Sequence, residues 1–380
     1  MTTKKLNILL VFGTRPEVIK MAPVVKEFRK YPAHFNCKVC VTGQHRQMID
    51  PLLKLFGIKV EYDLNLMRKN QTLDHITTTV LREIGGILEK EKTDYLVVQG
   101  DTTTAMAAAM AAFYKNVRVA HVEAGLRTFN KQHPFPEEVN RCIIDSMSDL
   151  YFAHTSSAKR NLIKEGVTPG KIEITGNTVI DALMETARKK FNFRGTPWER
   201  AIAKGRKLIL MTAHRRENFG RPIEEICQAV KEIAQRYSQE VTFVYPVHLN
   251  PNIQKPVYSI LEKVRNVILC DPMEYLPMVQ LMKRSFFVLT DSGGLQEEAP
   301  SLGKPVLVLR KTTERPEGVK AGCVEVVGTD FLSIVKKTSA LLENKKKYQR
   351  MAQAKNPYGD GTASKKIVAR MLQEQYKAAP

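Results

Sequence analysis

"LNILLVFGTRPEVIKMAPVVKEFRK", residues 6–30, holds the pattern that decides the fold. Its first seven residues are almost continuously apolar, which predicts a strand buried on both faces of a parallel sheet. Residues 17–30 then repeat apolar side chains at the spacing of an amphipathic helix. Between them Gly13 permits a sharp turn, and Pro16 suits the first helical turn, where a missing N–H costs nothing. Strand, turn and helix in this order are the repeating unit of a doubly wound α/β fold.

The same rhythm runs along the whole chain. A helix is expected over 102–115, and an irregular polar stretch, 187–207, follows a break near 171–183. Because apolar strands alternate with helices on both sides of this break, we expect two doubly wound domains that face each other across a cleft. The further apolar runs that predict strands are 36–43, 94–100, 118–125, 150–156, 207–213, 241–248, 267–272, 286–294 and 304–310.

The composition is that of a globular protein. Of the 380 residues, 43% are apolar and 26% are charged, and the length favours two domains. The formal net charge of +20 indicates a polyanionic partner, either nucleic acid or a phosphorylated small molecule. Basic runs such as 344–350 also read as solvated helix faces. Charge alone does not define a nucleic-acid binder, whose basic runs are interleaved with aromatic residues, so we expect no nucleic-acid partner.

The cysteines and the apolar stretches indicate a soluble, cytoplasmic protein. Cys37 and Cys40 have CxxC spacing, but in a strand residues three apart face opposite ways, and no second CxxC completes a zinc site. We therefore expect six reduced, mostly buried cysteines and no metal. The first apolar run is too short for a signal peptide. The most apolar helical stretch, 105–113, is far below the about 20 residues of a membrane span.

A second glycine turn, "DSGGLQEEAP" (291–300), also joins a predicted strand to a predicted helix. Either turn alone reads as a structural feature, but two such helix starts suit the two ends of a diphosphate. At the first turn Arg15 and Lys20 add positive charge. At the second turn the residues expected to offer backbone N–H groups are Ser292, Gly293 and Gly294.

The glutamates of the second turn have different expected roles. Glu298, about one turn into the helix, is placed to accept hydrogen bonds from a ribose diol, whereas Glu297 is a favourable charge in the first turn. No GxGxxG or GxxxxGK[ST] follows any predicted strand. These absences argue against a nicotinamide cofactor and against P-loop chemistry, so no cofactor is expected.

Acidic residues collect at the predicted strand ends. Asp101 ends one strand and reads equally as a helix N-cap. Glu123 lies late in a buried strand, where a carboxylate is costly unless it is paired or used. Glu137 follows two prolines and reads equally as a capping carboxylate. His214 ends the first strand of the second domain, and two arginines follow it, which suits a pyrophosphate neighbour. This set fits acid–base work on a nucleotide-linked substrate.

At these residues the sequence resembles the non-hydrolysing UDP-N-acetylglucosamine 2-epimerases. The resemblance covers residues 12 to about 317, and its blocks follow one another in the order of the family. The matching stretches are "FGTRPEVIKMAPV", "TGQHRQM", "GDTTT", "HVEAGLRT", "PFPEEVNR", "GNTVID", "HRREN", "DSGGLQEEAPSLGKPVLVLR" and "TTERPE".

The family resemblance implies a fold and an activity. The fold is the glycosyltransferase-B architecture of two Rossmann-like domains, with a C-terminal helix that returns to the first; the expected limits are 1–176 plus 360–380 and 177–359. The activity is interconversion of UDP-GlcNAc and UDP-ManNAc through elimination of UDP, a bound 2-acetamidoglucal and re-addition of UDP. The resemblance also implies a homodimer.

The resemblance assigns roles to individual positions. The implied catalytic residues are Asp101, Glu123, Glu137 and His214. The implied substrate-binding residues are Arg15, Lys20, Arg141, Met273, Met278, Ser292, Gly293, Gly294, Glu298 and Arg315. A second, activating UDP-GlcNAc site is implied at Gln44, Gln47, Glu137, Arg216 and His248, with Asn70 where the family commonly has arginine.

Two other activities stay open at this point. A related branch acts on UDP-2,3-diacetamido sugar acids and shares most of these blocks, although "GDTTT" favours UDP-GlcNAc. A glycosyltransferase of the same fold would transfer its sugar to an acceptor and would not need three carboxylates. The GTRPE and GDTTT blocks are typical of the non-hydrolysing branch rather than of relatives that release ManNAc and UDP.

Overall fold

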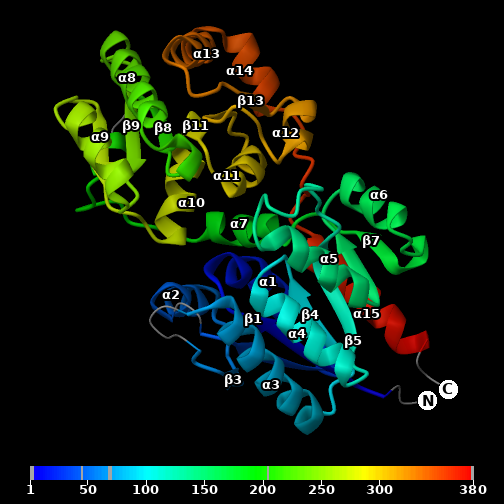
Figure 1. Ribbon diagram of the computed structural model, residues 1–380. Coiled ribbons are helices and arrows are strands. Elements are labelled where there is room, and N and C mark those ends of the chain that lie inside the picture. Colours follow the sequence, from blue (N-terminus) through cyan, green and yellow to red (C-terminus); the bar gives the residue numbers. More distant parts are fainter. Residues whose placement is uncertain (1–3, 44–45, 67–70, 203–204, 378–380) are drawn as a thin grey trace. The chain divides into compact units, whose positions relative to one another are not determined.

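The computed structural model describes residues 4–43, 46–66, 71–202 and 205–377 (Figure 1). The chain divides into two compact units, each a parallel β-sheet with helices on its faces, as the strand and helix pattern predicts. Unit 1 consists of Met1–Ala182 and Tyr358–Pro380, and unit 2 consists of Leu183–Pro357.

Unit 1 contains a seven-stranded sheet in the order β3-β2-β1-β4-β5-β6-β7. The chain builds outward from β1 to β3 and then continues on the other side of β1 with β4, so β1 and β4 flank the topological switch point. The strands are β1 (Leu6–Phe12), β2 (Phe35–Val41), β3 (Tyr62–Asp63), β4 (Tyr95–Gln99), β5 (Arg118–Ala124), β6 (Leu150–Ala153) and β7 (Ile172–Ile174). The helices are α1 (Arg15–Phe28), α2 (Arg46–Phe56), α3 (Leu73–Glu91), α4 (Thr103–Tyr114), α5 (Glu137–Met147), α6 (Ser156–Lys164) and α15 (Ala363–Lys377), and α7 (Thr178–Arg188) leads into unit 2.

Unit 2 contains a six-stranded parallel sheet in the order β10-β9-β8-β11-β12-β13, with its switch point between β8 and β11. Its strands are β8 (Lys207–Thr212), β9 (Val241–Pro246), β10 (Val267–Cys270), β11 (Phe287–Thr290), β12 (Val306–Val308) and β13 (Val324–Val326). Its helices are α8 (Arg221–Arg236), α9 (Pro251–Leu261), α10 (Tyr275–Arg284), α11 (Gly293–Glu298), α12 (Pro316–Ala321), α13 (Phe331–Glu343) and α14 (Lys345–Ala352).

The central strands owe their position to their apolar sequences. Every residue of β4 and of β11 is buried, and β1 and β8 each have only one residue that is partly exposed. Strands buried in this way need helices on both faces of the sheet. The alanine-rich helix α4 packs against both α3 and α5, because its small side chains permit a close approach.

The apolar pattern of the sequence did not predict three of the strands. The strands β3, β7 and β13 contain only two or three residues each. Such short segments have no measurable period of apolar residues and are fixed by pairing with the longer strands beside them. The stretch 187–207, expected to be irregular, holds the end of α7, a short 3-10 turn at Glu199–Ile202 and the first residue of β8; residues 203–204 lie outside the described part.

All six cysteines lie in the described part of the chain and are free. Cys37 and Cys40 are in β2, as the sequence predicts, and Cys142 has an exposed side chain. Within the described residues, no helix combines the length and the apolar character that a membrane span needs.

Candidate active site

The polar loops of unit 1 meet at the carboxyl ends of β1, β4 and β5. These strands are neighbours and run parallel, so the loops that follow them share one edge of the sheet. The hydroxyl of Thr102, after β4, donates to Glu17 Oε1 in α1 over 2.7 Å. The first glycine turn therefore lies beside the "GDTTT" segment at the switch point.

Glu17 fills the helix start that we expected to bind an anion. Its carboxylate accepts hydrogen bonds from the backbone N–H groups of Gly13 at 3.0 Å and Thr14 at 2.7 Å. Burial raises the pKa of Glu17, and these hydrogen bonds oppose the increase. The carboxylate of Glu17 thus occupies two of the donors at the helix start where we expected an anion. Gly13 is needed for a different reason, because a Cβ atom there would lie 1.9 Å from Thr42 Oγ1.

Glu123 is held in an unusual backbone conformation at the end of β5. The pairing of β5 with β6 shifts register between Val122 and Ala124, and Glu123 lies at this bulge with φ +68°. A bulge redirects a side chain, and a positive φ in a residue other than glycine is strained. The carboxylate is 7% exposed and accepts from Lys20 Nζ at 2.5 Å and Gln99 Nε2 at 2.6 Å. The expected buried carboxylate is thus paired.

Asp101 is not the cap of the helix that follows it. Thr102 caps α4, since its hydroxyl accepts the N–H of Ala105 at 3.0 Å. The carboxylate of Asp101 instead pairs with the guanidinium of Arg141 in α5. The same guanidinium donates to Glu138 at 2.9 Å. The alternative interpretation of Asp101 as a capping residue is therefore excluded, and its carboxylate is left about one quarter exposed at 26%.

Glu137, the third predicted carboxylate, is the first residue of α5. Its Oε2 atom is buried and has no hydrogen-bond partner among the described residues. Helix α5 has no side-chain cap, and the neighbouring Glu138 instead accepts the backbone N–H groups of Thr128 and Phe129 in the preceding loop at 2.8 to 3.0 Å. A buried carboxylate oxygen without a partner is costly, which fits a group that meets a ligand.

The switch point of unit 2 is organised by Asp291, directly after β11. This fully buried carboxylate accepts the backbone N–H of His214 at 2.7 Å and of Arg215 at 2.8 Å, and the side-chain amide of Asn218 at 3.0 Å. Its other oxygen lies 3.5 Å from His214 Nδ1. Burial lowers the pKa of His214, and His248 and Arg215 add to the decrease while Asp291 opposes it. His214 is therefore a neutral imidazole at pH 7.

Positive charge gathers at the second glycine turn. A Cβ atom on Gly293 would lie 3.5 Å from the guanidinium of Arg215 and 3.9 Å from that of Arg315. Neither Gly293 nor Gly294 has a positive φ, so the backbone conformation does not require glycine there. The missing side chain of Gly293 instead leaves space beside two guanidinium groups, and these groups favour an anion.

The two glutamates of α11 have separate partners. Glu297 is buried and pairs with the guanidinium of Arg315; it lies beyond the first turn of α11, so the expected first-turn charge was wrong. Glu298 is 7% exposed and accepts a hydrogen bond from the hydroxyl of Tyr275 at 2.7 Å. Glu297 therefore orients a guanidinium group, and Glu298 keeps a second carboxylate oxygen about 3.9 Å from the Cβ position of Gly294.

The remaining predicted residues are distributed between the two units. The imidazole of His248 is exposed and stacks on that of His214, with ring centroids 5.6 Å apart. The structure thus brings together one residue expected to be catalytic and one expected at the activating site. Met273 is buried, Arg15, Met278 and Ser292 are partly buried, and Arg216 is exposed. Gln44, Asn70 and the side chain of Gln47 lie outside the described residues.

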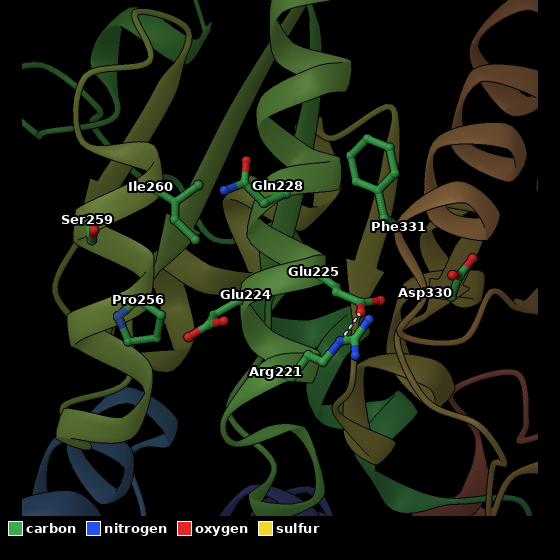
Figure 2. Close-up of a pocket in the computed structure, with 9 residues that line it drawn as sticks. All are labelled: Arg221, Glu224, Glu225, Gln228, Pro256, Ser259, Ile260, Asp330 and Phe331. Carbon is green, nitrogen blue, oxygen red and sulfur yellow. Dashed lines mark hydrogen bonds and ion pairs between the residues drawn. The ribbon is translucent and has the colours of Figure 1, made fainter.

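The groove drawn in Figure 2 is a separate feature of unit 2. It has a volume of about 690 Å³ and is bounded by α8, α9 and the start of α13. Arg221 points to Glu225 and pairs with it at 2.7 Å, and Glu224 and Asp330 add further negative charge to the walls. None of the predicted site residues lines this groove. Its charge does not suit a diphosphate.

Sequence reasoning missed three residues that organise these sites, namely Glu17, Gln99 and Asp291. The spacing of Thr14 and Glu17 is that of a capping box, a signal that could have identified Glu17. Gln99 and Asp291 are polar residues at the ends of apolar strands, where polar side chains serve a ligand or a neighbouring loop.

The fold defines a class of protein. Two Rossmann-like units, each with charged side chains at the switch point of its sheet, form a two-domain α/β enzyme of the glycosyltransferase-B type. Comparison with known proteins identifies the family. The family model of UDP-N-acetylglucosamine 2-epimerase matches residues 26–372. The UDP-N-acetylglucosamine 2-epimerase of Escherichia coli K12 is 51% identical over 368 residues, which are 96% of this chain and 97% of that protein.

Solved structures agree with this match. The crystal structure of the UDP-GlcNAc 2-epimerase from Neisseria meningitidis bound to UDP-GlcNAc is 48% identical with a TM-score of 0.87, and covers 97% of this chain and 100% of that chain. The structure of the Methanocaldococcus jannaschii UDP-GlcNAc 2-epimerase with UDP-GlcNAc and UDP is 33% identical with a TM-score of 0.79, and the coverage is again 97% and 100%. The chain belongs to the UDP-N-acetylglucosamine 2-epimerase family, a family of isomerases.

Proposed function

We propose that this chain interconverts UDP-N-acetylglucosamine and UDP-N-acetylmannosamine by inverting C2 of the sugar, without a nicotinamide cofactor or a metal ion. The observation that carries the proposal is the similarity over nearly the full length to relatives that bear the name of this activity. The carboxylates of unit 1 and the guanidinium groups of unit 2 support it. The reaction needs proton transfer at the sugar and stabilisation of charge at the diphosphate.

The chemistry proceeds by elimination and addition. The C2 proton is not next to a carbonyl group, so simple deprotonation would be too costly. A base removes this proton while the C1–O bond breaks, its electron pair leaves with UDP, and a C1=C2 double bond forms in 2-acetamidoglucal. In the second step the UDP oxygen adds to C1, and an acid protonates C2 on the opposite face. Nothing is oxidised or reduced overall, and both fragments stay bound between the steps.

The proton transfers fall to Asp101, Glu123 and Glu137. The guanidinium of Arg141 pairs with Asp101 and the ammonium of Lys20 pairs with Glu123, so each of these two carboxylates has a cationic neighbour. The unpartnered oxygen of Glu137 is available to a ligand. We assign to these three side chains the removal of the proton from one face of C2 and its return on the other face.

The nucleotide is held by the switch point of unit 2. The guanidinium groups of Arg215 and Arg315 flank the space over Gly293, where a phosphate would fit. The backbone around Ser292 and Gly294 approaches the same anion, and the carboxylate of Glu298 binds the ribose hydroxyls. His214, which is neutral in the free protein, donates to the leaving diphosphate once the nucleotide is bound. Met273 and Met278 bind the substrate by apolar contact, and Arg15, on α1, takes a phosphate or sugar oxygen.

The assignment is tested by incubating the protein with UDP-GlcNAc and following the mixture by proton and phosphorus NMR. The expected products are UDP-GlcNAc and UDP-ManNAc at equilibrium, with all sugar still linked to UDP. Release of free ManNAc and UDP would place the chain with the hydrolysing relatives. No turnover, together with C2 epimerisation of a UDP-2,3-diacetamido sugar acid, would support the alternative branch instead.

We also propose a second, activating UDP-GlcNAc site at Gln44, Gln47, Glu137, Arg216 and His248. The stacking of His248 on His214 supports this proposal, because it gives an effector a direct physical contact with a catalytic side chain. The family resemblance further implies a homodimer, which light scattering of the purified protein would test.

A further inference from the structure

A buried ion pair lies beneath the turn that carries Asp101. His121, in β5, is completely buried, and its Nδ1 lies 2.6 Å from Asp145 Oδ1. Its Nε2 lies 2.7 Å from the carbonyl oxygen of Gly100. A carbonyl oxygen only accepts hydrogen bonds, and a carboxylate does the same. Both ring nitrogens of His121 therefore face hydrogen-bond acceptors. None of the roles described above uses this pair.

The other half of the pair is equally well connected. Asp145 Oδ2 accepts the backbone N–H of Gly125 at 3.1 Å and a guanidinium N–H of Arg127 at 2.7 Å. Arg127 also pairs with Glu165 at 2.6 Å. Burial would raise the pKa of Asp145, but His121 and then Arg127 hold it below the ordinary value. Arg127, whose side chain is buried, thus joins the buried Asp145 to the exposed Glu165.

The three segments that contact this pair are those that carry the three carboxylates. Gly100 directly precedes Asp101 and has φ +72°. Gly125 follows Glu123 by two residues. Asp145 belongs to α5, the helix that begins at Glu137. The loop after β4, the loop after β5 and helix α5 are therefore joined at one buried contact.

We propose that His121 and Asp145 are positioning residues that hold Asp101, Glu123 and Glu137 in register for the proton transfers at C2. They touch neither substrate nor reacting atoms. This inference rests on the proposed epimerase function. A displacement of about 1 Å in a reacting group can lower the rate by about 100-fold, so loss of the contact that holds the turn of Asp101 acts mainly on kcat.

Two substitutions of His121 separate its contacts. The amide nitrogen of His121→Asn reaches the place of Nδ1, so it keeps the contact with Asp145 and loses that with Gly100. The longer His121→Gln reaches the place of Nε2 and keeps the contact with Gly100. We expect His121→Asn to lower kcat by about 100-fold and His121→Gln by less than about tenfold. The KM for UDP-GlcNAc and the Kd for UDP should stay within about threefold, because unit 2 holds the nucleotide.

A matched control is His34→Asn, which removes an imidazole at the opposite, amino-terminal edge of the same sheet. His34 Nδ1 contacts Gln375 at 2.9 Å, and we expect this variant to keep full activity. If His121 had a merely structural role, the loss of kcat in each of the two variants would parallel the decrease of its thermal midpoint. If only His121→Gln folds, a 100-fold or so loss of its kcat despite the retained Gly100 contact would overturn the proposal.

A double-mutant cycle gives the deciding result. In an Asp101→Asn background, His121→Asn should cost less than about tenfold, because the Gly100 contact that it removes acts on Asp101, which is already replaced. If the double variant lowers kcat by the full product of the two single effects, His121 acts independently of Asp101, and this result would contradict the inference. A wild-type protein without epimerase activity would reject the proposed function itself, which is a different outcome.

Discussion

At the scale of single residues, the structure separates two interpretations that the sequence leaves open for Asp101. Thr102 is the helix cap, and Asp101 pairs with Arg141 instead. We therefore predict that Asp101→Asn lowers kcat by at least about 100-fold, the usual scale of lost acid–base catalysis. Glu123→Gln and Glu137→Gln should do the same, with UDP affinity nearly unchanged. Steady-state kinetics and UDP titration on the same samples check this. Retained activity with lowered stability in Asp101→Asn would contradict it.

His214 provides a prediction about pH. Its pKa is lowered in the free protein, and a nearby diphosphate favours the imidazolium and raises that pKa. Binding of UDP is therefore coupled to proton uptake, and the affinity should increase as the pH falls from about 8 to about 6. One pKa unit of difference corresponds to about tenfold in affinity. Calorimetry in buffers of different ionisation enthalpy measures the uptake. His214→Asn serves as the control, since UDP titrates itself; equal proton uptake by both proteins would exclude the assignment.

At the scale of elements, strands were predictable where they were long. Continuous apolar runs identified β1, β4, β8 and β11, whereas β7 has three residues and no period. The bulge at Glu123 was not predictable, because it depends on the register of β5 against β6. The partner of Glu123 is Lys20, 103 residues away, and such a contact is fixed by the order of strands in the sheet. The carboxylates themselves were visible in the sequence, but their partners were not.

Helix α1 gives a prediction about stability. Glu17 satisfies two backbone N–H groups and the hydroxyl of Thr102, so Glu17→Ala leaves buried donors without a partner. We expect a loss of about 2 kcal/mol or more, which lowers the thermal midpoint of unit 1 by about 4–8 °C. Calorimetry of the variant measures this. Glu89→Ala is the matched control, because that exposed carboxylate pairs with Lys115 at the surface. Equal midpoints in the two variants would contradict the capping role.

At the scale of the whole molecule, the repeated rhythm of strands and helices predicts the fold class, but it does not predict how the activity is regulated. The family resemblance implies an activating UDP-GlcNAc, and the stacked imidazoles of His214 and His248 offer a contact through which it would act. With UDP-ManNAc as the only substrate, we predict a lag that trace UDP-GlcNAc shortens and His248→Ala lengthens. The exposed neighbour Leu249 provides a control, Leu249→Ala. A full rate from the start, insensitive to added UDP-GlcNAc, would show that no activating site operates.

The central claim is that the C2 proton leaves and returns while UDP departs and re-adds. Turnover of UDP-GlcNAc in D2O, followed by NMR of the isolated product, tests this claim most directly. The account predicts UDP-ManNAc that carries deuterium at C2, because the acid on the second face exchanges with solvent before it protonates the glucal. UDP-ManNAc that keeps the original hydrogen at C2 would contradict the elimination mechanism.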